Sequence, residues 1–343
     1  MAEAVRARGP GRVNLIGEHT DYNGGLALPF AIARGVTVTA EPLAGARVQA
    51  RALDLGEQDE FPLAAPERAS GWRAFVRGTV AELAAAGYAL RPCRLTIEGD
   101  IERGSGLSSS AALEAALCLA LLAVAGANEP ADRRELARLC SRVENDWVGA
   151  ETGLLDQLAS LCGAPGHAVR IDFATLAVDA VALDLGDWGL VTLDSGAAHS
   201  HAQSGYNDRR RECREACAAL GVASLREVRE GDLERLPEAL RWRARHVLTE
   251  NLRVDAMVTA LGAGDLEAAG RLLDASHASL RDDYEVSVAA VERTVEALRA
   301  AGAAGARMVG GGFGGAVLAL LPPGVVAPAG AVAVAPGPPA GLV

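Results

Sequence analysis

GSGLSSSAA, residues 104–112, is the stretch of sequence that decides the fold. A strand-like run, Cys93 to Ile97, precedes it, and a strongly apolar segment with helical spacing, residues 113–124, follows it. The first N–H groups of a helix have no intrahelical partner and carry partial positive charge. A glycine-rich entry with three serine hydroxyls therefore favours a bound anion. The stretch predicts a cradle for a triphosphate, and an ordinary serine N-cap after a tight turn is the alternative.

A second glycine cluster, Gly310 to Gly315, matches the pattern G-x-G-x-x-G by letter. In a dinucleotide-binding fold that pattern follows a strand and begins a helix. Here an apolar, strand-like run, Ala316 to Leu321, follows it, so we reject a dinucleotide site. So many glycines still imply that something passes close to the backbone. The sequence leaves open whether that is a ligand or another segment of the chain.

A third motif, residues 11–22, is polar and lies near the start of the chain. It contains Arg12, Glu18, His19 and Asp21. An ionised carboxylate can accept hydrogen bonds from several hydroxyls, so carboxylates that converge on one pocket suit a polyhydroxyl ligand. A solvated loop with salt bridges explains the same residues, and composition alone favours that alternative.

Outside these motifs the periodicity predicts an α+β chain in two parts, with a boundary near Ala180. The two predicted domains are residues 1–180 and 181–343. We expect strands at residues 12–16, 35–40, 93–97, 168–172, 189–193, 306–309 and 316–321. We expect helices at residues 71–86, from 110 onward, at 133–148, over much of 206–261, and from 288 to a stop at Gly302. The tail, rich in Pro, Gly, Ala and Val, carries little information about secondary structure.

Composition indicates a globular protein that stays in the cytoplasm. Of the 343 residues 50% are hydrophobic and 22% are charged, which is not the composition of a disordered chain. No apolar run is long enough to span a membrane, and the first residues lack the apolar core of a signal peptide. The six cysteines are scattered without a C-x-x-C pair, so we expect reduced, mostly buried thiols.

The charged residues exclude several function classes. The net charge of −11 argues against a nucleic-acid partner, because phosphates require a basic surface. All basic residues are arginines, and the chain contains no lysine. A P-loop, a protein kinase and Schiff-base chemistry each require a lysine. If the chain handles ATP, it must therefore hold the phosphates mainly with backbone amides and hydroxyls.

In their order along the chain, the three motifs resemble the signature motifs of the GHMP small-molecule kinases. The segment PGRVNLIGEHTDYNGG, residues 10–25, is similar to the signature of the galactokinases within that family. The resemblance spans nearly the whole chain and continues through GLSSSAALEAA, GLLDQLAS, SGYNDRRREC, RARHVLTENLR, SHASLRDDYEVS and GGGFGGAVLAL. It implies an N-terminal domain like ribosomal protein S5 domain 2, a ferredoxin-like C-terminal domain, and an active site between them.

The resemblance also implies an activity, its cofactors and its partners. The activity is transfer of the γ-phosphoryl group of ATP, with Mg²⁺, to the C1 hydroxyl of galactose. Alternatives are a related kinase for N-acetylgalactosamine or arabinose, or a non-catalytic galactose sensor. A damaged serine loop would mark a sensor, whereas residues 108–112 and Asp156 are intact here. We expect no nucleic acid, no membrane and no obligate protein partner.

Site residues follow from the same resemblance, position by position. The sugar pocket is assigned to Arg12, Glu18, His19, Asp21, Gly153, Asp156 and Tyr206. Within it Asp156 would act as the base or as an orienting carboxylate, and Arg12 would help to keep it ionised. The phosphate loop is assigned to Gly104, Ser105, Gly106, Leu107, Ser108, Ser109 and Ser110. The ligands of Mg²⁺ would be Ser109 and Glu144.

Overall fold

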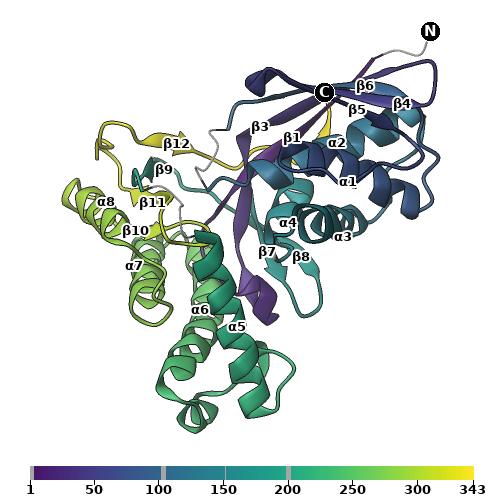
Figure 1. Ribbon diagram of the computed structural model, residues 1–343. Helices are drawn as coiled ribbons and strands as arrows, with labels where there is room; N and C mark the ends of the chain where they lie inside the picture. The colour runs from purple at the N-terminus through teal and green to yellow at the C-terminus, as the bar shows by residue number, and fades with distance from the viewer. Residues whose placement is uncertain (1–3, 102–105, 151, 198–201) are drawn as a thin grey trace.

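The computed structural model describes residues 4–101, 106–150, 152–197 and 202–343, with three β-sheets flanked by helices (Figure 1). The largest sheet has the strand order β13-β1-β3-β6-β4-β5. Its strands are β1 (Val5–Asn14), β3 (Pro29–Pro42), β4 (Arg47–Ala52), β5 (Glu57–Pro62), β6 (Cys93–Gly99) and β13 (Gly341–Leu342). All neighbours are antiparallel except β4 and β6.

Two helices, α2 (Ser109–Ala125) and α4 (Leu155–Cys162), pack against this sheet, and two more, α1 (Trp72–Ala85) and α3 (Arg133–Arg142), pack against the other helices. The central helix is α2, in which nearly every side chain is buried. That burial explains why its sequence is apolar on all sides. A π-helical turn, η3 (Val143–Val148), continues α3. Such widened turns are frequent at functional sites, and this one carries the buried Glu144.

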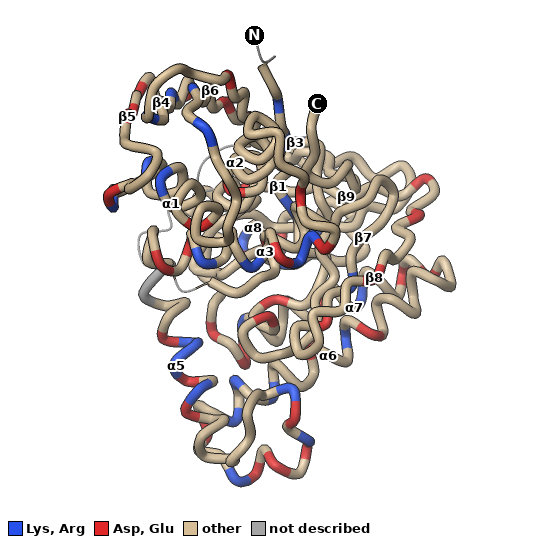
Figure 2. Tube along the Cα trace, turned by 90° about the vertical axis from the view of Figure 1, so that its right-hand side faces the viewer, with Lys and Arg blue, Asp and Glu red and all other residues tan. Residues whose placement is uncertain are grey.

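The second core lies around a four-stranded sheet with the order β10-β11-β9-β12. Its strands are β9 (Gly189–Asp194), β10 (Gly305–Met308), β11 (Ala316–Leu321) and β12 (Val332–Val334), and its helices are α5 (Ala202–Leu220), α6 (Glu238–Ala263), α7 (Leu266–Asp282) and α8 (Ala289–Ala300). Acidic and basic residues lie close together in the middle of α5 (Figure 2).

A third, small sheet consists of β2 (Leu26–Ala27), β7 (His167–Asp172) and β8 (Ala177–Ala182). Single helical turns are η1 (Asp21–Asn23), η2 (Leu53–Leu55), η4 (Leu225–Glu227) and η5 (Glu230–Arg235). Because β2 follows the polar motif directly and pairs with β7, this sheet fixes the far end of that motif.

The predicted α+β class is confirmed, and so are most of the expected elements. The helix expected at residues 133–148 is present but changes from α to π at Val143. The tail, about which the sequence carries little information, contains two short strands, β12 and β13. Through β13 the end of the chain returns to β1, as the position of the C-terminus in Figure 1 shows. The boundary near Ala180 stays a prediction.

Among the residues that the structure describes, no helix is long and apolar enough to cross a membrane. All six cysteines are free thiols, of which four are buried and Cys162 and Cys217 are partly exposed.

Candidate active site

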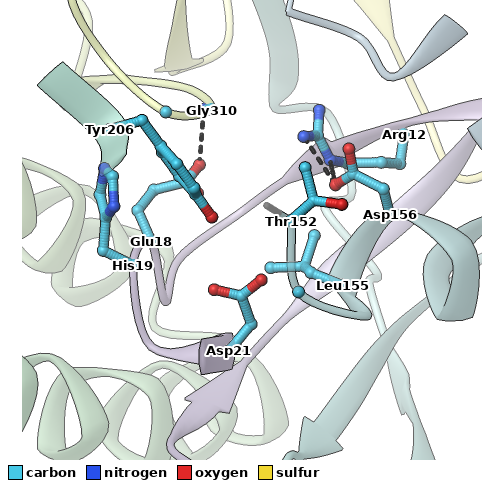
Figure 3. Close-up of a pocket in the computed structure, with 11 residues that line it drawn as sticks. Arg12, Glu18, His19, Asp21, Thr152, Leu155, Asp156, Tyr206 and Gly310 are labelled. Atoms are coloured by element: carbon cyan, nitrogen blue, oxygen red, sulfur yellow. Dashed lines mark hydrogen bonds and ion pairs between the residues drawn. The ribbon is translucent and has the colours of Figure 1, made fainter. Parts of the chain in front are cut away.

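A cavity of about 230 Å³ collects the residues of the polar motif and joins them to segments far away in the sequence (Figure 3). It is lined by Arg12, Glu18, His19, Asp21, Thr152, Gly153, Leu155, Asp156, Tyr206, Gly310 and Gly311. These residues come from β1, the loop after it, the entry of α4, the first turns of α5, and the glycine-rich loop between β10 and β11. The cavity thus lies where elements of both cores meet.

Asp156 is held by two groups on the side of the phosphate loop. Its Oδ1 accepts hydrogen bonds from Nε and Nη2 of Arg12, both at 2.8 Å. Its Oδ2 accepts from the hydroxyl of Ser108. The Arg12 side chain is 8% exposed and the Asp156 side chain 29%, so the carboxylate still faces the cavity. A carboxylate beside a buried guanidinium and open to a ligand is placed to accept a proton or to orient a hydroxyl.

The strand β1 carries Arg12 to the start of α2. The register between β1 and β3 shifts between Pro10 and Arg12, which is a bulge of the kind that redirects a side chain. The backbone N–H of Arg12 donates to the carbonyl of Leu107 at 3.1 Å, and its guanidinium donates to the carbonyl of Gly106. Hydrogen bonds therefore join the polar motif directly to the serine-rich stretch at the start of α2, although the two lie more than 90 residues apart in sequence.

Glu18 is buried and is oriented by the second glycine cluster. Its Oε1 accepts the backbone N–H of Gly310 at 2.8 Å and lies 3.4 Å from Nη2 of Arg307. Arg307 is fully buried in β10 and donates to the carbonyls of Asn14 and Leu15 at 2.9 and 3.0 Å. One oxygen of Glu18 is thus engaged by the protein, which leaves the other for a ligand.

His19 lies among aromatic rings at the back of the cavity. Its ring centroid is 4.7 Å from that of Tyr284 and 5.4 Å from that of Tyr206. Burial lowers the pKa of His19 to about 3, and the nearby His246 and Arg209 add to the lowering. The imidazole is therefore neutral at physiological pH.

Asp21 explains why position 153 is a glycine. A Cβ built on Gly153 would lie 1.9 Å from Oδ2 of Asp21, so any side chain there would displace the carboxylate. Burial and the negative charges of Asp156 and Glu18 raise the pKa of Asp21 to about 6, although Arg210 partly offsets them. The backbone N–H of Tyr22 bonds to this carboxylate and lowers its pKa, but by less than burial raises it. The hydroxyls of a ligand can supply further hydrogen bonds.

A second cavity of about 340 Å³ lies on the other side of the start of α2. It is lined mainly by apolar groups of β3, β6 and α1, and by the hydroxyls of Ser109 and Ser110. Trp72 forms part of its wall and donates from Nε1 to Glu57 at 2.9 Å. An apolar slot that ends at serine hydroxyls and a helix N-terminus suits a flat base whose phosphates point toward α2.

Glu144 lies close to the start of α2 as well and is 7% exposed. Its Oε2 accepts from Oγ1 of Thr152 at 2.8 Å and from Nε2 of Gln157 at 2.7 Å, and the hydroxyl of Ser110 also bonds to it. Burial raises the pKa of Glu144, and the negative charge of Asp156 raises it further. Two carboxylates with such mutual repulsion suit a divalent cation.

Helix α6 supports the polar motif from behind. The fully buried Glu250 accepts the backbone N–H of Gly17 at 3.0 Å, and Asn251 accepts that of Leu26 at 2.8 Å. Nε2 of His246 lies 3.1 Å from the carbonyl of Glu18. The motif RARHVLTENLR thus acts on the cavity through the backbone of the first motif, without lining the cavity itself.

The structure brings all seven predicted sugar-pocket residues to one cavity. Of the predicted phosphate loop, Gly104 and Ser105 lie outside the described residues. Ser108 precedes α2 but makes no capping bond with its side chain, so the N-cap alternative does not describe it. The serine bonded to Glu144 is Ser110, and Ser109 faces the second cavity. At the glycine cluster another segment of the chain does pass close to the backbone, since Gly312 packs against Val286. Gly310 and Gly311 line the cavity, and the approach of a ligand to them stays a prediction.

Sequence reasoning missed Arg307, Glu250 and His246, which hold the polar motif in place. The signal for Arg307 was present, since it is a single charge in an otherwise apolar run, Ala306 to Val309. A buried guanidinium of this kind needs acceptors, and it finds them in the carbonyls of the first motif. No local pattern distinguishes the buried Glu250 from the exposed acidic residues of a long helix.

Models of three protein families match the chain. The galactokinase galactose-binding signature matches residues 2–42, the GHMP kinases N-terminal domain matches residues 74–164, and the GHMP kinases C-terminal domain matches residues 257–334.

Relatives of known name agree with these matches. A galactokinase of Mycobacterium tuberculosis is 48% identical over 321 residues, which cover 91% of this chain and 88% of the relative. A galactokinase of Thermotoga neapolitana is 41% identical over 317 residues, or 92% of this chain and 89% of the relative. Among solved structures, Lactococcus lactis galactokinase complexed with galactose superposes with a TM-score of 0.92 at 35% identity. That similarity covers 99% of this chain and 95% of the other.

Proposed function

Because the chain belongs to the galactokinases of the GHMP kinase family, which are ATP-dependent sugar kinases, we propose that its first cavity binds galactose and that Asp156 receives the proton of the attacking hydroxyl. The observation that carries this proposal is the pair of contacts from Arg12 and Ser108 to Asp156. They aim one carboxylate into the cavity at the point where the phosphate loop begins.

The reaction begins with the sugar held by acceptors and donors of the first cavity. Glu18 and Asp21 accept hydrogen bonds from sugar hydroxyls, and the rings of Tyr206 and His19 close one wall. Gly153 leaves the space that Asp21 and the sugar share. Holding the hydroxyl in place converts an encounter into an intramolecular step, which contributes a large part of the rate enhancement in phosphoryl transfer.

Asp156 then accepts or orients the proton of the C1 hydroxyl. At the same time the oxygen of that hydroxyl forms a bond to the γ-phosphorus. The bond between that phosphorus and the β–γ bridging oxygen breaks, and ADP leaves with the bonding electrons. Arg12 holds the carboxylate of Asp156 in place through its contact at 2.8 Å. The proton later passes from Asp156 to water.

The nucleotide is proposed to lie in the second cavity, with its phosphates at residues 106–110. Backbone N–H groups of the first turn of α2 and the serine hydroxyls would bind the phosphate oxygens. No lysine is needed for this arrangement, which fits a chain without any.

From the resemblance we propose that Ser109 and Glu144 hold Mg²⁺, although the serine that bonds to Glu144 in the ligand-free chain is Ser110. Oxygen ligands are what Mg²⁺ prefers, and phosphate oxygens and water would complete its six ligands. Among the residues that the structure describes, no group of three or more His, Cys, Asp or Glu could hold a metal, which fits a metal that arrives with the nucleotide. When bound, Mg²⁺ neutralises charge on the phosphates.

The experiment that tests the proposal is ADP release from Mg·ATP with galactose, N-acetylgalactosamine, arabinose and glucose. We expect turnover with galactose and weak turnover with the other sugars. In Asp156→Ala, kcat should fall by about 10³-fold, within the range for loss of a general base. Asp187→Ala, an exposed aspartate outside both cavities, is the matched control and should retain full activity.

Other outcomes identify the alternatives. Preference for N-acetylgalactosamine or arabinose would move the substrate and retain the mechanism. Sugar binding without turnover, seen as a galactose-dependent rise in melting temperature, would overturn the kinase proposal in favour of a sensor.

A further inference from the structure

Behind the first cavity lies a row of polar side chains that ends at His19; the proposed mechanism assigns no role to its other members, which are buried except for the partly exposed Tyr22. It runs from Asn23 through Cys213, Tyr284 and Tyr22 to His19. The successive distances are 3.6 Å from Asn23 Nδ2 to Cys213 Sγ, 3.0 Å from Cys213 Sγ to Tyr284 Oη, 3.0 Å from Tyr284 Oη to Tyr22 Oη, and 2.8 Å from Tyr22 Oη to Nδ1 of His19.

Each group in the middle of this row carries one hydrogen. Cys213 is 2% exposed and Tyr284 is fully buried. Burial raises the pKa of Cys213 to about 11 and raises the pKa values of Tyr22 and Tyr284 well above their usual value, so all three stay protonated. A thiol or phenol with one hydrogen can donate once and can accept as well. The row can therefore run in one of two directions, each with every hydrogen pointing the same way.

Asn23 selects the direction. Its Nδ2 donates to the backbone carbonyl of His19 at 2.8 Å, and because a carbonyl only accepts, this contact identifies the nitrogen end of the amide. The second N–H of that nitrogen points at Cys213, whose sulfur must then accept. The thiol hydrogen is left for Tyr284, the Tyr284 hydrogen for Tyr22, and the Tyr22 hydrogen for Nδ1 of His19. The opposite direction would place the thiol hydrogen against an N–H.

His19 receives the end of this chain of hydrogen bonds. If Nδ1 accepts from Tyr22, the single hydrogen of the neutral ring is on Nε2. That nitrogen is buried and makes no hydrogen bond of good geometry in the part of the chain that the structure describes, although the backbone of Gly311 interacts with the ring and raises its pKa; His19 and Gly311 both line the first cavity. Nε2 is therefore the ring atom that remains for a ligand.

We propose that Asn23, Cys213, Tyr284 and Tyr22 are positioning residues that fix His19 as the Nε2–H tautomer, so that it offers the sugar a hydrogen-bond donor. The identification of the ligand as a sugar rests on the proposed function. The cavity then contains both acceptors and a donor of hydrogen bonds. Glu18 and Asp21, when ionised, can only accept hydrogen bonds, whereas His19 donates one. A sugar hydroxyl could then donate to a carboxylate and accept from His19 with its lone pair.

The tautomer can be observed directly, without sugar, in a long-range ¹H–¹⁵N correlation spectrum of the ¹⁵N-labelled protein, with the His19 signals assigned through His19→Gln. We expect the Nε2–H pattern in the unsubstituted protein. Cys213→Ala and Tyr284→Phe remove a link and should give a mixture of tautomers. Cys217→Ala, one turn further along α5 and outside the row, is the matched control and should keep the Nε2–H pattern. An Nδ1–H pattern in the unsubstituted protein, or an unchanged tautomer in both variants, would overturn the proposal.

Kinetics test the consequence for the sugar. In Cys213→Ala and Tyr284→Phe we expect KM for galactose to rise about fivefold, the size of one neutral hydrogen bond, with kcat within about twofold. Cys213→Ser keeps one hydrogen and one acceptor and should restore both KM and the tautomer. A fall in kcat at unchanged KM would contradict the positioning role.

Modified sugars separate donor from acceptor. Fluorine can accept weakly but cannot donate, whereas a deoxy position does neither. At one position of galactose, the fluoro sugar should therefore have a higher kcat/KM than the deoxy sugar, and Tyr284→Phe should reduce that difference. If no position of galactose shows this difference, the role of His19 as a hydrogen-bond donor is overturned. An Nε2–H spectrum in a protein that does not phosphorylate galactose would sink the proposed function and leave the tautomer established.

Discussion

Gly153 and Asp21 form a pair in which the absence of one side chain makes room for the other. Positions of this kind are visible in a sequence only as a glycine beside a catalytic motif, and the clash that a Cβ would cause depends on the folded structure. The same is true of the burial of Glu18 and His19, for which composition favoured a solvated loop. The resemblance to a known family supplied the correct grouping, and the three-dimensional structure supplied the reason for it.

Gly153→Ala should displace the Asp21 carboxylate and weaken sugar binding. We expect KM for galactose to rise by about tenfold, the effect of losing one hydrogen bond to a charged group, with kcat within about threefold. Gly189→Ala is the control, because a Cβ at that position meets no atom within 4 Å. An unchanged KM in Gly153→Ala would show that Asp21 does not contact the sugar.

The pKa of Asp21, raised to about 6, predicts how sugar binding depends on pH. Below pH 6 the ligand-free carboxylate becomes protonated and loses acceptor capacity, so KM for galactose should rise by up to tenfold per pH unit. Asp156, Glu18 and Arg210 face this group and should shift the midpoint by their charges. Asp21→Asn should bind galactose weakly at every pH and remove this part of the dependence. Steady-state KM between pH 5 and 8 is the measurement.

Asp21→Asn should also make the ligand-free protein more stable at high pH. The folded pKa of about 6 exceeds the reference value of 3.8, so the folded state binds more protons between those values. The contribution of Asp21 to the free energy of unfolding is therefore full below pH 4 and is lost as pH rises through 6. We expect a higher melting temperature for Asp21→Asn at pH 8 and no difference at pH 4. Lower stability at pH 8 would contradict the raised pKa.

Single elements were predictable where their signal was local. The periodicity of α1, α2 and α8 and the strand-like runs at β6, β7 and β11 needed no tertiary information. The strands β12 and β13 were missed because Pro and Gly surround them and because their pairing partners, β9 and β1, lie more than 130 residues away. The π-helical turn at Val143 was missed because helical spacing does not distinguish it from an α-turn.

The buried hydrogen bonds of Glu250 are expected to be a main contribution of α6 to the stability of the fold. It accepts from the backbone of Gly17, from Ser276 at 2.7 Å and from Arg253 at 2.7 Å, all in the interior. Glu250→Gln keeps the volume and removes the charge, and should lower the free energy of unfolding by about 3 kcal/mol in urea denaturation. Leu252→Ala, on the same helix with a side chain that is 63% exposed, is the control and should have little effect.

The effect of Glu250→Gln should depend on pH in the opposite sense to that of Asp21. Burial alone would raise the pKa of Glu250, but Arg253, His246 and Arg307 lower it to about 2, below the reference value of 4.5. Its stabilising contribution is complete above pH 4.5 and is lost as pH falls toward 2. The difference in stability between the variant and the unsubstituted protein should therefore shrink over that range.

At the scale of the whole molecule, the last residues tie the chain back to the largest sheet. Ala340 donates to the carbonyl of Ser160 and accepts from Arg133, both at 2.8 Å, and β13 pairs with β1. Removal of residues 340–343 should lower the melting temperature by several degrees. Because no residue of the first cavity comes from this segment, kcat at 25 °C should stay within about twofold. Val326→Ser, at a side chain that is 83% exposed, is the control.

The position of β13 also has a consequence for how the protein is made. Translation releases the N-terminus first, so β1 pairs with β3 early while its other edge has no neighbour until residues 341–342 emerge from the ribosome. An open strand edge can recruit another nascent chain, and charged residues such as Arg6 and Arg8 on β1 discourage that. Loss of residues 341–342 should therefore leave the edge of β1 unpaired and make the protein more prone to aggregation.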